Sequence, residues 1–155
     1  MKKIVLLSLV CVMCVMVAGL AFAQKKATQK EAIALADKAA AYLKANGEAK
    51  AFAEFNKKDG PFTDMSKDLY VFVFDMTGKC LSHGANPALI GRDLSGLKDS
   101  DGSFFIKEFT TTAKTKGSGW VDYNWSNPTT KKIEPKSTYI LKVADNMLIG
   151  CGIYK

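Results

Sequence analysis

Hydrophobic residues recur at helical spacing in the stretch that begins near residue 28. Thr28 and Glu31 have the spacing of a capping box, in which each side chain bonds the backbone N–H of the other residue. Asn46-Gly47 ends the pattern, because these residues are favoured where a helix stops. The pattern predicts a helix from 28 to about 46, and its apolar side chains are Ile33, Ala36, Ala40 and Leu43.

A second, shorter helix is predicted from Glu48 to about Lys57. Phe52 and Phe55 lie on one side of this segment, and Asp59-Gly60-Pro61 terminates it. Both helices precede every strand that the pattern predicts.

Extended segments make up much of the remaining chain. Leu69 to Phe74 is continuously apolar, and the turn-like residues 75–78 join it to a second extended run at Lys79 to His83, which predicts a hairpin. A tight turn at Ala144-Asp145-Asn146 joins the last two of three later strands. These three strands are expected at about 119–126, 135–143 and 146–154.

The region between the hairpin and the later strands is predicted to be a structured loop and a helix. Residues 83–94 are rich in Gly, Asn and Pro. Asp101-Gly-Ser is expected to open a helix that runs to about Lys116. The whole order predicts an α+β domain with a PAS-like architecture, in which a long N-terminal helix and further helices pack on a central five-stranded antiparallel sheet.

The first 23 residues have the parts of a secretory signal peptide. Lys2 and Lys3 give a basic start, residues 4–20 are almost wholly apolar, and Ala21-Phe22-Ala23 is a small-x-small cleavage signature. Cleavage would leave residues 24–155 as one periplasmic or secreted domain. An uncleaved membrane anchor is the alternative, because the apolar run is close to the roughly 20 residues that span a bilayer.

Charge and motifs narrow the function classes. The formal charge of +7 falls to +5 without Lys2 and Lys3, and the other lysines are scattered, so no nucleic acid partner is predicted. The sequence has no serine-hydrolase elbow, zinc-protease helix, phosphate-binding loop or dinucleotide fingerprint. The chain has a single histidine, the residue type that most often acts in acid–base catalysis. A binding protein rather than an enzyme is therefore predicted.

Cys80 and Cys151 are the cysteines that would remain after cleavage. An oxidising compartment permits a disulfide, but the predicted topology puts them on strands that are not neighbours, so both states stay open. Cys80 also begins a Cys-x-x-His run that ends at His83, yet haem attachment needs a second cysteine in the motif. Odd spacing on a strand points the two side chains to opposite faces. No metal site and no cofactor are predicted.

The stretch from 117 to 139 combines large aromatic residues with one well-placed lysine. Trp120, Tyr123 and Trp125 can wall a small pocket, and Lys136 can bind an anionic head group. Strand alternation puts Tyr123 and Trp125 on one face and Trp120 on the other, so Trp120 needs a bulge or an end effect to join them. Ordinary core packing is the competing interpretation.

Short sequence blocks follow one another in a characteristic order along the predicted domain. They are Tyr70-Val-Phe-Val-Phe-Asp75, Gly78-Lys-Cys-Leu-Ser-His83, Asn86-Pro87, Gly91-Arg-Asp-Leu94, Asp101-Gly102, Gly117-Ser-Gly-Trp-Val-Asp-Tyr-Asn-Trp125, Asn127-Pro128, Pro135-Lys-Ser-Thr-Tyr139 and Gly152-Ile-Tyr154. Together they resemble the single Cache domain family, of which this chain would be a standalone secreted member. That family's domains are PAS-like extracytoplasmic sensors, and many bind short organic acids over the sheet. The resemblance implies ligand sensing.

The resemblance also implies roles for particular residues. His83 and Lys136 would be partners for a carboxylate, and Tyr70 and Phe72 would line the inward face of the first long strand. Tyr139 is included with them, although strand alternation puts it on the face opposite Lys136. The sequence leaves that conflict open.

The expected ligand is small, because one charge pair and an aromatic lid can hold about four to six heavy atoms with roughly micromolar affinity. Acetate, propionate, pyruvate and lactate fit this limit. Signalling would pass to a separate membrane receptor or kinase, and a homodimer through the N-terminal helix is a further partner hypothesis. The alternative function is a ligand-free adaptor that docks on a membrane receptor.

Overall fold

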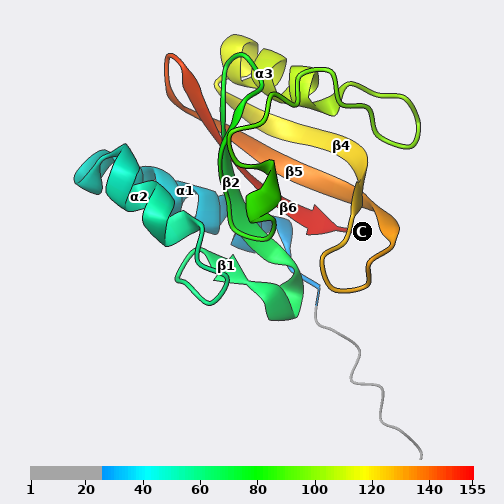
Figure 1. Ribbon diagram of the computed structural model, residues 1–155, viewed down its shortest axis with the longest axis horizontal. Helices are drawn as coiled ribbons and strands as arrows, with labels where there is room; N and C mark the ends of the chain where they lie inside the picture. Colours follow the sequence, from blue (N-terminus) through cyan, green and yellow to red (C-terminus); the bar gives the residue numbers. More distant parts are fainter. Residues whose placement is uncertain (1–25) are drawn as a thin grey trace, which may run out of the picture.

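The structure, a computed structural model, describes residues 26–155 (Figure 1). It confirms the predicted α+β class and adds a two-residue strand to the five that the sequence predicts; the predicted signal peptide lies outside the described residues. The helices are α1 (Gln29–Asn46), α2 (Glu48–Phe55) and α3 (Phe105–Lys116), with short 3-10 turns η1 (Met65–Lys67) and η2 (Pro87–Leu89). The strands are β1 (Thr63–Asp64), β2 (Leu69–Asp75), β3 (Cys80–His83), β4 (Ser118–Ser126), β5 (Ile133–Ala144) and β6 (Met147–Tyr154).

All strand pairs in the sheet are antiparallel. β2 pairs with β3 and with β6, β5 follows β6, and β4 forms the far edge. The predicted hairpin is the β2–β3 pair, and the predicted tight turn joins β5 to β6. The order brings strands from both ends of the described chain side by side, so residues far apart in sequence can share one face of the sheet.

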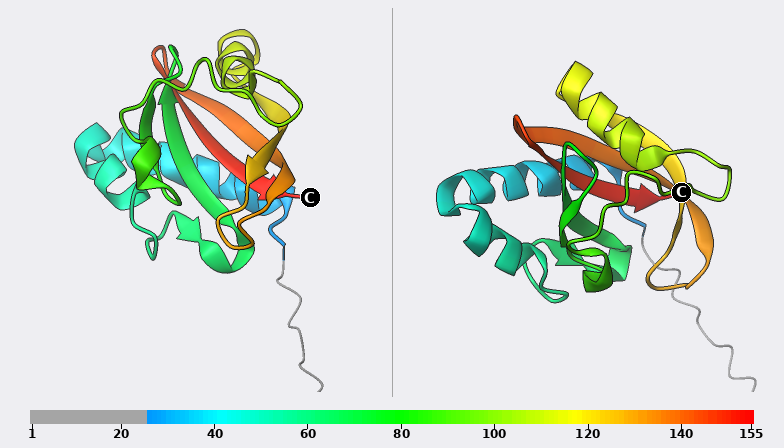
Figure 2. Two further views of the ribbon diagram at one scale, coloured as in Figure 1. Left: turned by 45° about the vertical axis from the view of Figure 1, so that its right-hand side comes forward. Right: turned by 45° about the horizontal axis from the view of Figure 1, so that its top comes forward.

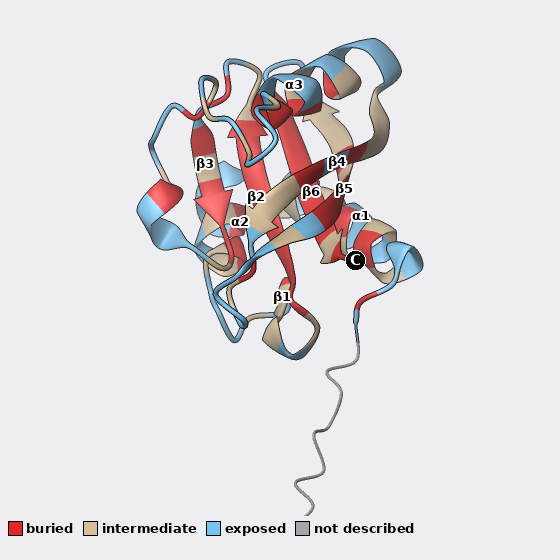
Figure 3. Cartoon of the chain, turned by 90° about the vertical axis from the view of Figure 1, so that its right-hand side faces the viewer, coloured by how far each residue is buried: buried red, intermediate tan, exposed pale blue. Residues whose placement is uncertain are grey.

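The two faces of the sheet carry separate hydrophobic clusters. Tyr70, Phe72 and Phe74 of β2 belong to the cluster under α3, whereas Val71 and Val73 belong to the cluster under α1 and α2. Figures 1 and 2 show α1 and α2 on one side of the sheet and α3 on the other. In Figure 3 burial is concentrated in the central strands. A strand covered on both faces can be continuously apolar, which explains the unbroken hydrophobic run of β2.

The boundaries of α1 follow the sequence pattern. The Thr28 hydroxyl accepts the N–H of Glu31 at 3.2 Å, and the Glu31 carboxylate accepts the N–H of Thr28 at 2.8 Å, which completes the capping box. Gly47 ends the helix with a φ of 75°, a conformation that favours glycine. The buried face is made of alanines, whose small side chains let the helix lie close to the sheet: Ala32, Ala36 and Ala39.

The start of α3 differs from the prediction. The expected opening at Asp101-Gly-Ser is wrong, since the helix begins at Phe105. The Asp99 carboxylate accepts the N–H groups of Asp101 and Ser103 at 3.0 and 2.8 Å and that of Asn124 on β4 at 3.0 Å. Residues 99–103 therefore fold around this carboxylate, which competes with the helix for the same donors.

Both cysteines are buried free thiols. Cys80 on β3 belongs to the cluster under α3 and Cys151 on β6 to the cluster under α1, with β2 between the two strands. The disulfide that the sequence leaves open is therefore not formed. Along residues 26–155 no helix has the length and apolarity needed to cross a bilayer, and the same residues contain no group of three His, Cys, Asp or Glu that could hold a metal ion.

The hydrogen bonds between Asn56, at the end of α2, and β3 give a first prediction. The Oδ1 of Asn56 accepts the Ser82 hydroxyl at 2.7 Å and the His83 backbone N–H at 3.0 Å. Asn56→Ala would leave both buried donors without this acceptor, so we expect the free energy of unfolding to fall by about 1–3 kcal/mol in urea denaturation. Asn56→Asp keeps an acceptor at the same place and should lose less. Equal losses in the two variants would contradict this role for Asn56.

Candidate ligand-binding site

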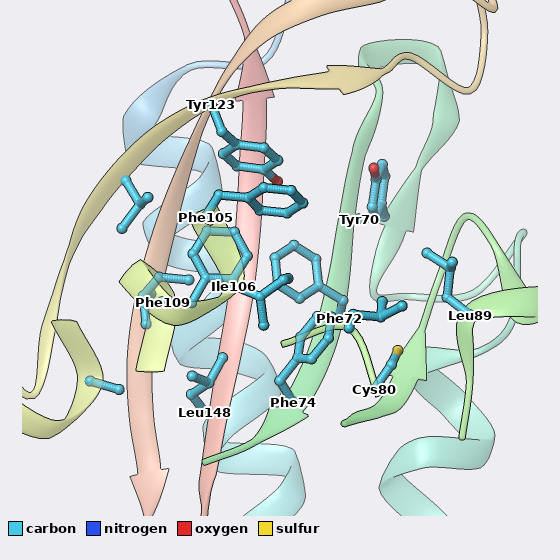
Figure 4. Packing of buried hydrophobic residues seen from close by; sticks show 14 residues of the cluster. Tyr70, Phe72, Phe74, Cys80, Leu89, Phe105, Ile106, Phe109, Tyr123 and Leu148 are labelled. Atoms are coloured by element: carbon cyan, nitrogen blue, oxygen red, sulfur yellow. The ribbon is translucent and has the colours of Figure 1, made fainter. Parts of the chain in front are cut away.

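A small cavity lies between the sheet and α3, on the face that carries the aromatic residues of β2 (Figure 4). Its volume is ≈ 20 Å³, which is room for about one water molecule. The floor comes from β2, β3, β4 and β5, and the roof comes from α3 and the segment before it. The lining residues are Tyr70, Phe72, Phe74, His83, Leu89, Leu94, Phe105, Ile106, Phe109, Tyr123, Trp125 and Lys136.

Lys136 is the basic residue of this cavity with the most unusual surroundings. It is 1% exposed, and its Nζ donates a hydrogen bond to the Tyr70 hydroxyl at 2.7 Å. Nζ also lies over the rings of Tyr70 and Tyr154, at 4.1 and 4.7 Å from their centroids. Lys136 forms no ion pair with any residue in the range 26–155. Burial lowers the pKa of Lys136 to about 7, against an opposing effect of Cys151 and Asp68.

Two glycines of β6 make room for the side chains that form the floor. A Cβ on Gly152 would lie 2.3 Å from Cε of Lys136, and a Cβ on Gly150 would lie 2.1 Å from the Phe72 ring. The stem of Lys136 therefore reaches the cavity across a strand position that has no side chain. These glycines were not among the predicted site residues. The signal was available, because glycine inside a strand marks a close approach of other atoms.

His83 is held at the end of β3 as a neutral imidazole. Its Nδ1 accepts the backbone N–H groups of Ala85 and Asn86 at 3.3 and 3.0 Å, so its proton is assigned to Nε2. Burial, helped by the charge of Lys136, lowers the pKa of His83 to about 3. The ring stacks on Phe72 with a centroid distance of 5.8 Å. His83 thus offers the cavity a neutral N–H donor.

The tyrosines of the site are neutral donors as well. Burial raises the pKa of Tyr70, Tyr123 and Tyr154 above the ordinary value. Tyr154 donates to the Ser126 carbonyl at 3.0 Å, and its hydroxyl lies 3.4 Å from that of Tyr70. The Tyr123 hydroxyl lies 3.1 Å from that of Thr138. The cavity therefore combines hydroxyl and N–H donors with a single amine.

Aromatic rings close the rest of the cavity. The Phe105 ring of α3 stacks on Tyr123 of β4 with centroids 4.4 Å apart and an interplanar angle of 5° (Figure 4). Phe105 and Phe109 are roof residues that the sequence reasoning did not name. Their helical spacing on the buried side of α3 is the pattern that could have identified them.

The structure brings six of the eight predicted site residues to the cavity: Tyr70, Phe72, His83, Tyr123, Trp125 and Lys136. It does not bring Trp120 and Tyr139 there. They form a cross-strand pair with ring centroids 5.5 Å apart, and both pack against the cluster on the α1 side of the sheet. Strand alternation accounts for this placement, because the pairing of β4 with β5 has no register shift that would turn these side chains over.

The neutral state of His83 predicts a pH-dependent stability. Its pKa is about 3 in the folded protein and near 6.5 when unfolded, so the unfolded chain binds more protons between these values. The stabilisation is complete above pH 6.5 and is lost as the pH falls toward 3, with a limiting slope of about 1.4 kcal/mol per pH unit. His83→Asn keeps an acceptor near Nδ1 but does not titrate. We expect it to flatten the dependence of urea-derived stability on pH between about pH 6 and 4. An unchanged slope would show that His83 is not buried in its neutral form.

Comparison with known proteins gives relatives among bacterial chemoreceptors. The methyl-accepting chemotaxis protein McpP of Pseudomonas putida is 34% identical over 88 residues, which cover 56% of this chain and 16% of that receptor. The chain therefore matches less than a fifth of the length of this curated relative.

Solved structures share the fold. A methyl-accepting chemotaxis protein from Vibrio parahaemolyticus has a TM-score of 0.66 at 30% identity, with 81% of this chain and 86% of that chain covered. A Cache chemosensory domain described for its recognition of carboxylic acids has a TM-score of 0.67 at 24% identity, with coverages of 81% and 91%. The family model for single Cache domain 2 matches residues 8–155, and the chain belongs to this family of extracytoplasmic sensor domains.

Proposed function

We propose that this chain is a sensor domain for a short carboxylate of the acetate, propionate, pyruvate or lactate class, and that it relays binding to a separate membrane receptor or kinase. The observation that carries the proposal is the buried amine of Lys136, which no carboxylate pairs within residues 26–155. A buried ammonium without a partner is costly, and the cost falls when an anion comes to lie beside it. An anionic ligand would supply the negative charge that no carboxylate of residues 26–155 places beside this amine.

The other polar groups of the cavity suit the second oxygen of a carboxylate. Lys136 would bind one oxygen, and the Tyr70 hydroxyl or the Nε2–H of His83 would bind the other. Hydrogen bonds in which one partner is ionised are roughly twice as strong as neutral ones. The flanking Phe72 and Phe105 rings would cover the short apolar part of the acid. This arrangement favours a monocarboxylate, because the lining offers no second cation.

The size of the cavity implies a conformational change on binding. A volume of ≈ 20 Å³ holds no acid of four to six heavy atoms without movement of the lining. Leu89, at the end of η2, and Leu94 reach the cavity from the segment between β3 and α3, which is the part of the roof outside the α-helix. Ligand binding would shift this segment, and Asn56 would pass the shift from His83 to α2.

The comparisons support a role in signal transduction and a carboxylate as the ligand. McpP is a chemotaxis receptor, and the Cache domain at 24% identity shows that the same fold can recognise carboxylic acids. Pairing of two copies through α1 stays a prediction. The extracytoplasmic location of the family supports the predicted periplasmic or secreted location. We propose that the signal peptide is cleaved after Ala23.

The small volume of the cavity favours the second candidate function, a ligand-free adaptor that keeps the fold and docks on a membrane receptor. The two functions differ in their response to acids. A binding protein is stabilised in proportion to the logarithm of the ligand concentration, and an adaptor is not.

A thermal-shift screen of the purified protein tests the proposed function. We expect a rise in Tm with at least one of acetate, propionate, pyruvate and lactate at millimolar concentration, and a smaller rise or none with succinate and glycine. Lys136→Met should weaken binding by about 100-fold or more in calorimetry, because it removes the charged partner. Lys142→Met is the matched control on the same strand, where the lysine is partly exposed and pairs with Asp145. If no acid raised the Tm, the result would contradict the proposed function and favour the adaptor function.

A substitution on β6 tests the position of the amine without touching it. Gly152→Ala would place a Cβ 2.3 Å from Cε of Lys136 and from Oγ1 of Thr138. We expect it to displace the amine and to weaken acid binding at least tenfold, since a shift of about 1 Å breaks a charge-assisted hydrogen bond. Gly96→Ala, at a glycine with open space around its Cβ, is the control. Unchanged binding in Gly152→Ala would separate Lys136 from the ligand.

A further inference from the structure

We propose that the pocket takes up one proton with each carboxylate that it binds above neutral pH, so that the domain responds to the acid and to acidity together. The proposal rests on the carboxylate-binding function above and adds its regulation. It follows from the geometry of one amine that is buried in an aromatic cavity, hydrogen-bonded to a phenol, and unpaired with any carboxylate of residues 26–155.

The phenols, the thiol and the imidazole that face Lys136 do not titrate near neutral pH. Burial raises the pKa of the phenols above the ordinary value and that of Cys151 to about 12, and it lowers the pKa of His83 to about 3. α3 and the segment before it contribute only apolar side chains to the cavity. The titratable neighbours are Tyr70 and Asp68 at β2, His83 on β3, Tyr123 on β4, and Cys151 and Tyr154 on β6.

Asp68 is the carboxylate whose charge raises the pKa of Lys136. The hydrogen bonds of Asp68 are made with other residues. Asp68 accepts from the Nδ2 of Asn127 at 3.0 Å and from the Thr129 hydroxyl. Asp122 on β4 is exposed and pairs with Lys155 at 2.8 Å. Neither forms an ion pair with the buried amine. The charge state of Lys136 is therefore governed by burial when the pocket is empty.

A bound carboxylate would change that charge state. With the pocket empty, the pKa of Lys136 is about 7, so the amine is largely neutral above this pH. A carboxylate within hydrogen-bonding distance favours the ammonium and raises the pKa of the amine in the complex. Above pH 7 the complex must then bind a proton that the empty protein lacks. Below pH 7 the amine is already protonated, and binding takes up none.

The expected dependence of affinity on pH has a fixed sign. The carboxyl groups of these short acids have pKa values below about 5 and stay ionised across the range. The Kd should be nearly constant below about pH 6.5 and should rise by up to about tenfold per pH unit above about pH 7.5, until the pH reaches the pKa of the amine in the complex. Where accumulation of the acid lowers the pH of the medium, the ligand concentration and the affinity would therefore rise together.

Calorimetry on the full protein with acetate and with pyruvate tests this coupling. At about pH 6 and about pH 8.5, the binding enthalpy is measured in buffers of different ionisation enthalpy, and the slope of one against the other gives the protons bound. We expect a value near zero at the lower pH and a value approaching one at the higher pH. Lys142→Met should behave like the wild type. Binding with the same Kd at both pH values and no proton uptake would overturn the coupling and leave the proposed function standing. No binding at either pH would overturn both.

An NMR titration of the ligand-free wild type makes the test independent of variants that fail to fold. The lysine side-chain Cε and Hε signals should show one residue that titrates near pH 7, as burial of Lys136 requires, and that signal should move to higher pH with acid present. Titration of all lysines near the ordinary value of about 10.4 would overturn the proposal.

Discussion

The arrangement of this domain depends on one amine that is buried on an aromatic sheet face. Lys136 is 1% exposed and shares its hydrogen bond with a phenol rather than a carboxylate. Removing an ammonium from water costs several kcal/mol unless an opposite charge or strong hydrogen bonds compensate. The protein meets this cost in part by lowering the pKa of the amine to about 7. Strongly shifted pKa values inside a cavity are typical of functional sites, and the proposed carboxylate would place the opposite charge beside this amine.

The rest of the structure holds that amine in place and surrounds it. β6 provides the space through Gly152, while β2 supplies the phenol of Tyr70 and the ring of Phe72. α3 covers the cavity with Phe105, which stacks on Tyr123. His83 is fixed by N–H groups of the following residues and, through its own backbone, by Asn56 at the end of α2. The pocket on one face of the sheet is thus connected by hydrogen bonds to the helices on the other face.

Local patterns in the sequence predicted most of the fold. The capping box of α1, the apolar run of β2 and the tight turn between β5 and β6 each depend on neighbouring residues, and the structure confirms them. The start of α3 was wrong because the Asp99 carboxylate binds donors on β4, a contact between distant segments that no local pattern reveals. For the site, strand alternation predicted the separation of Trp120 from Trp125, and the structure places Trp120 with Tyr139 on the other face. Gly152 inside a strand was a sequence signal of a close approach, but which side chain passes over it depends on the register between β5 and β6.

The most direct test of this account is a crystal structure of the protein grown with the acid that stabilises it best. The account predicts a carboxylate oxygen within about 3 Å of the Lys136 Nζ, a Tyr70 hydroxyl that has moved from Nζ toward the ligand, and a cavity enlarged beyond ≈ 20 Å³. An acid bound elsewhere on the protein, with Lys136 still bonded to Tyr70 in an unchanged cavity, would contradict it.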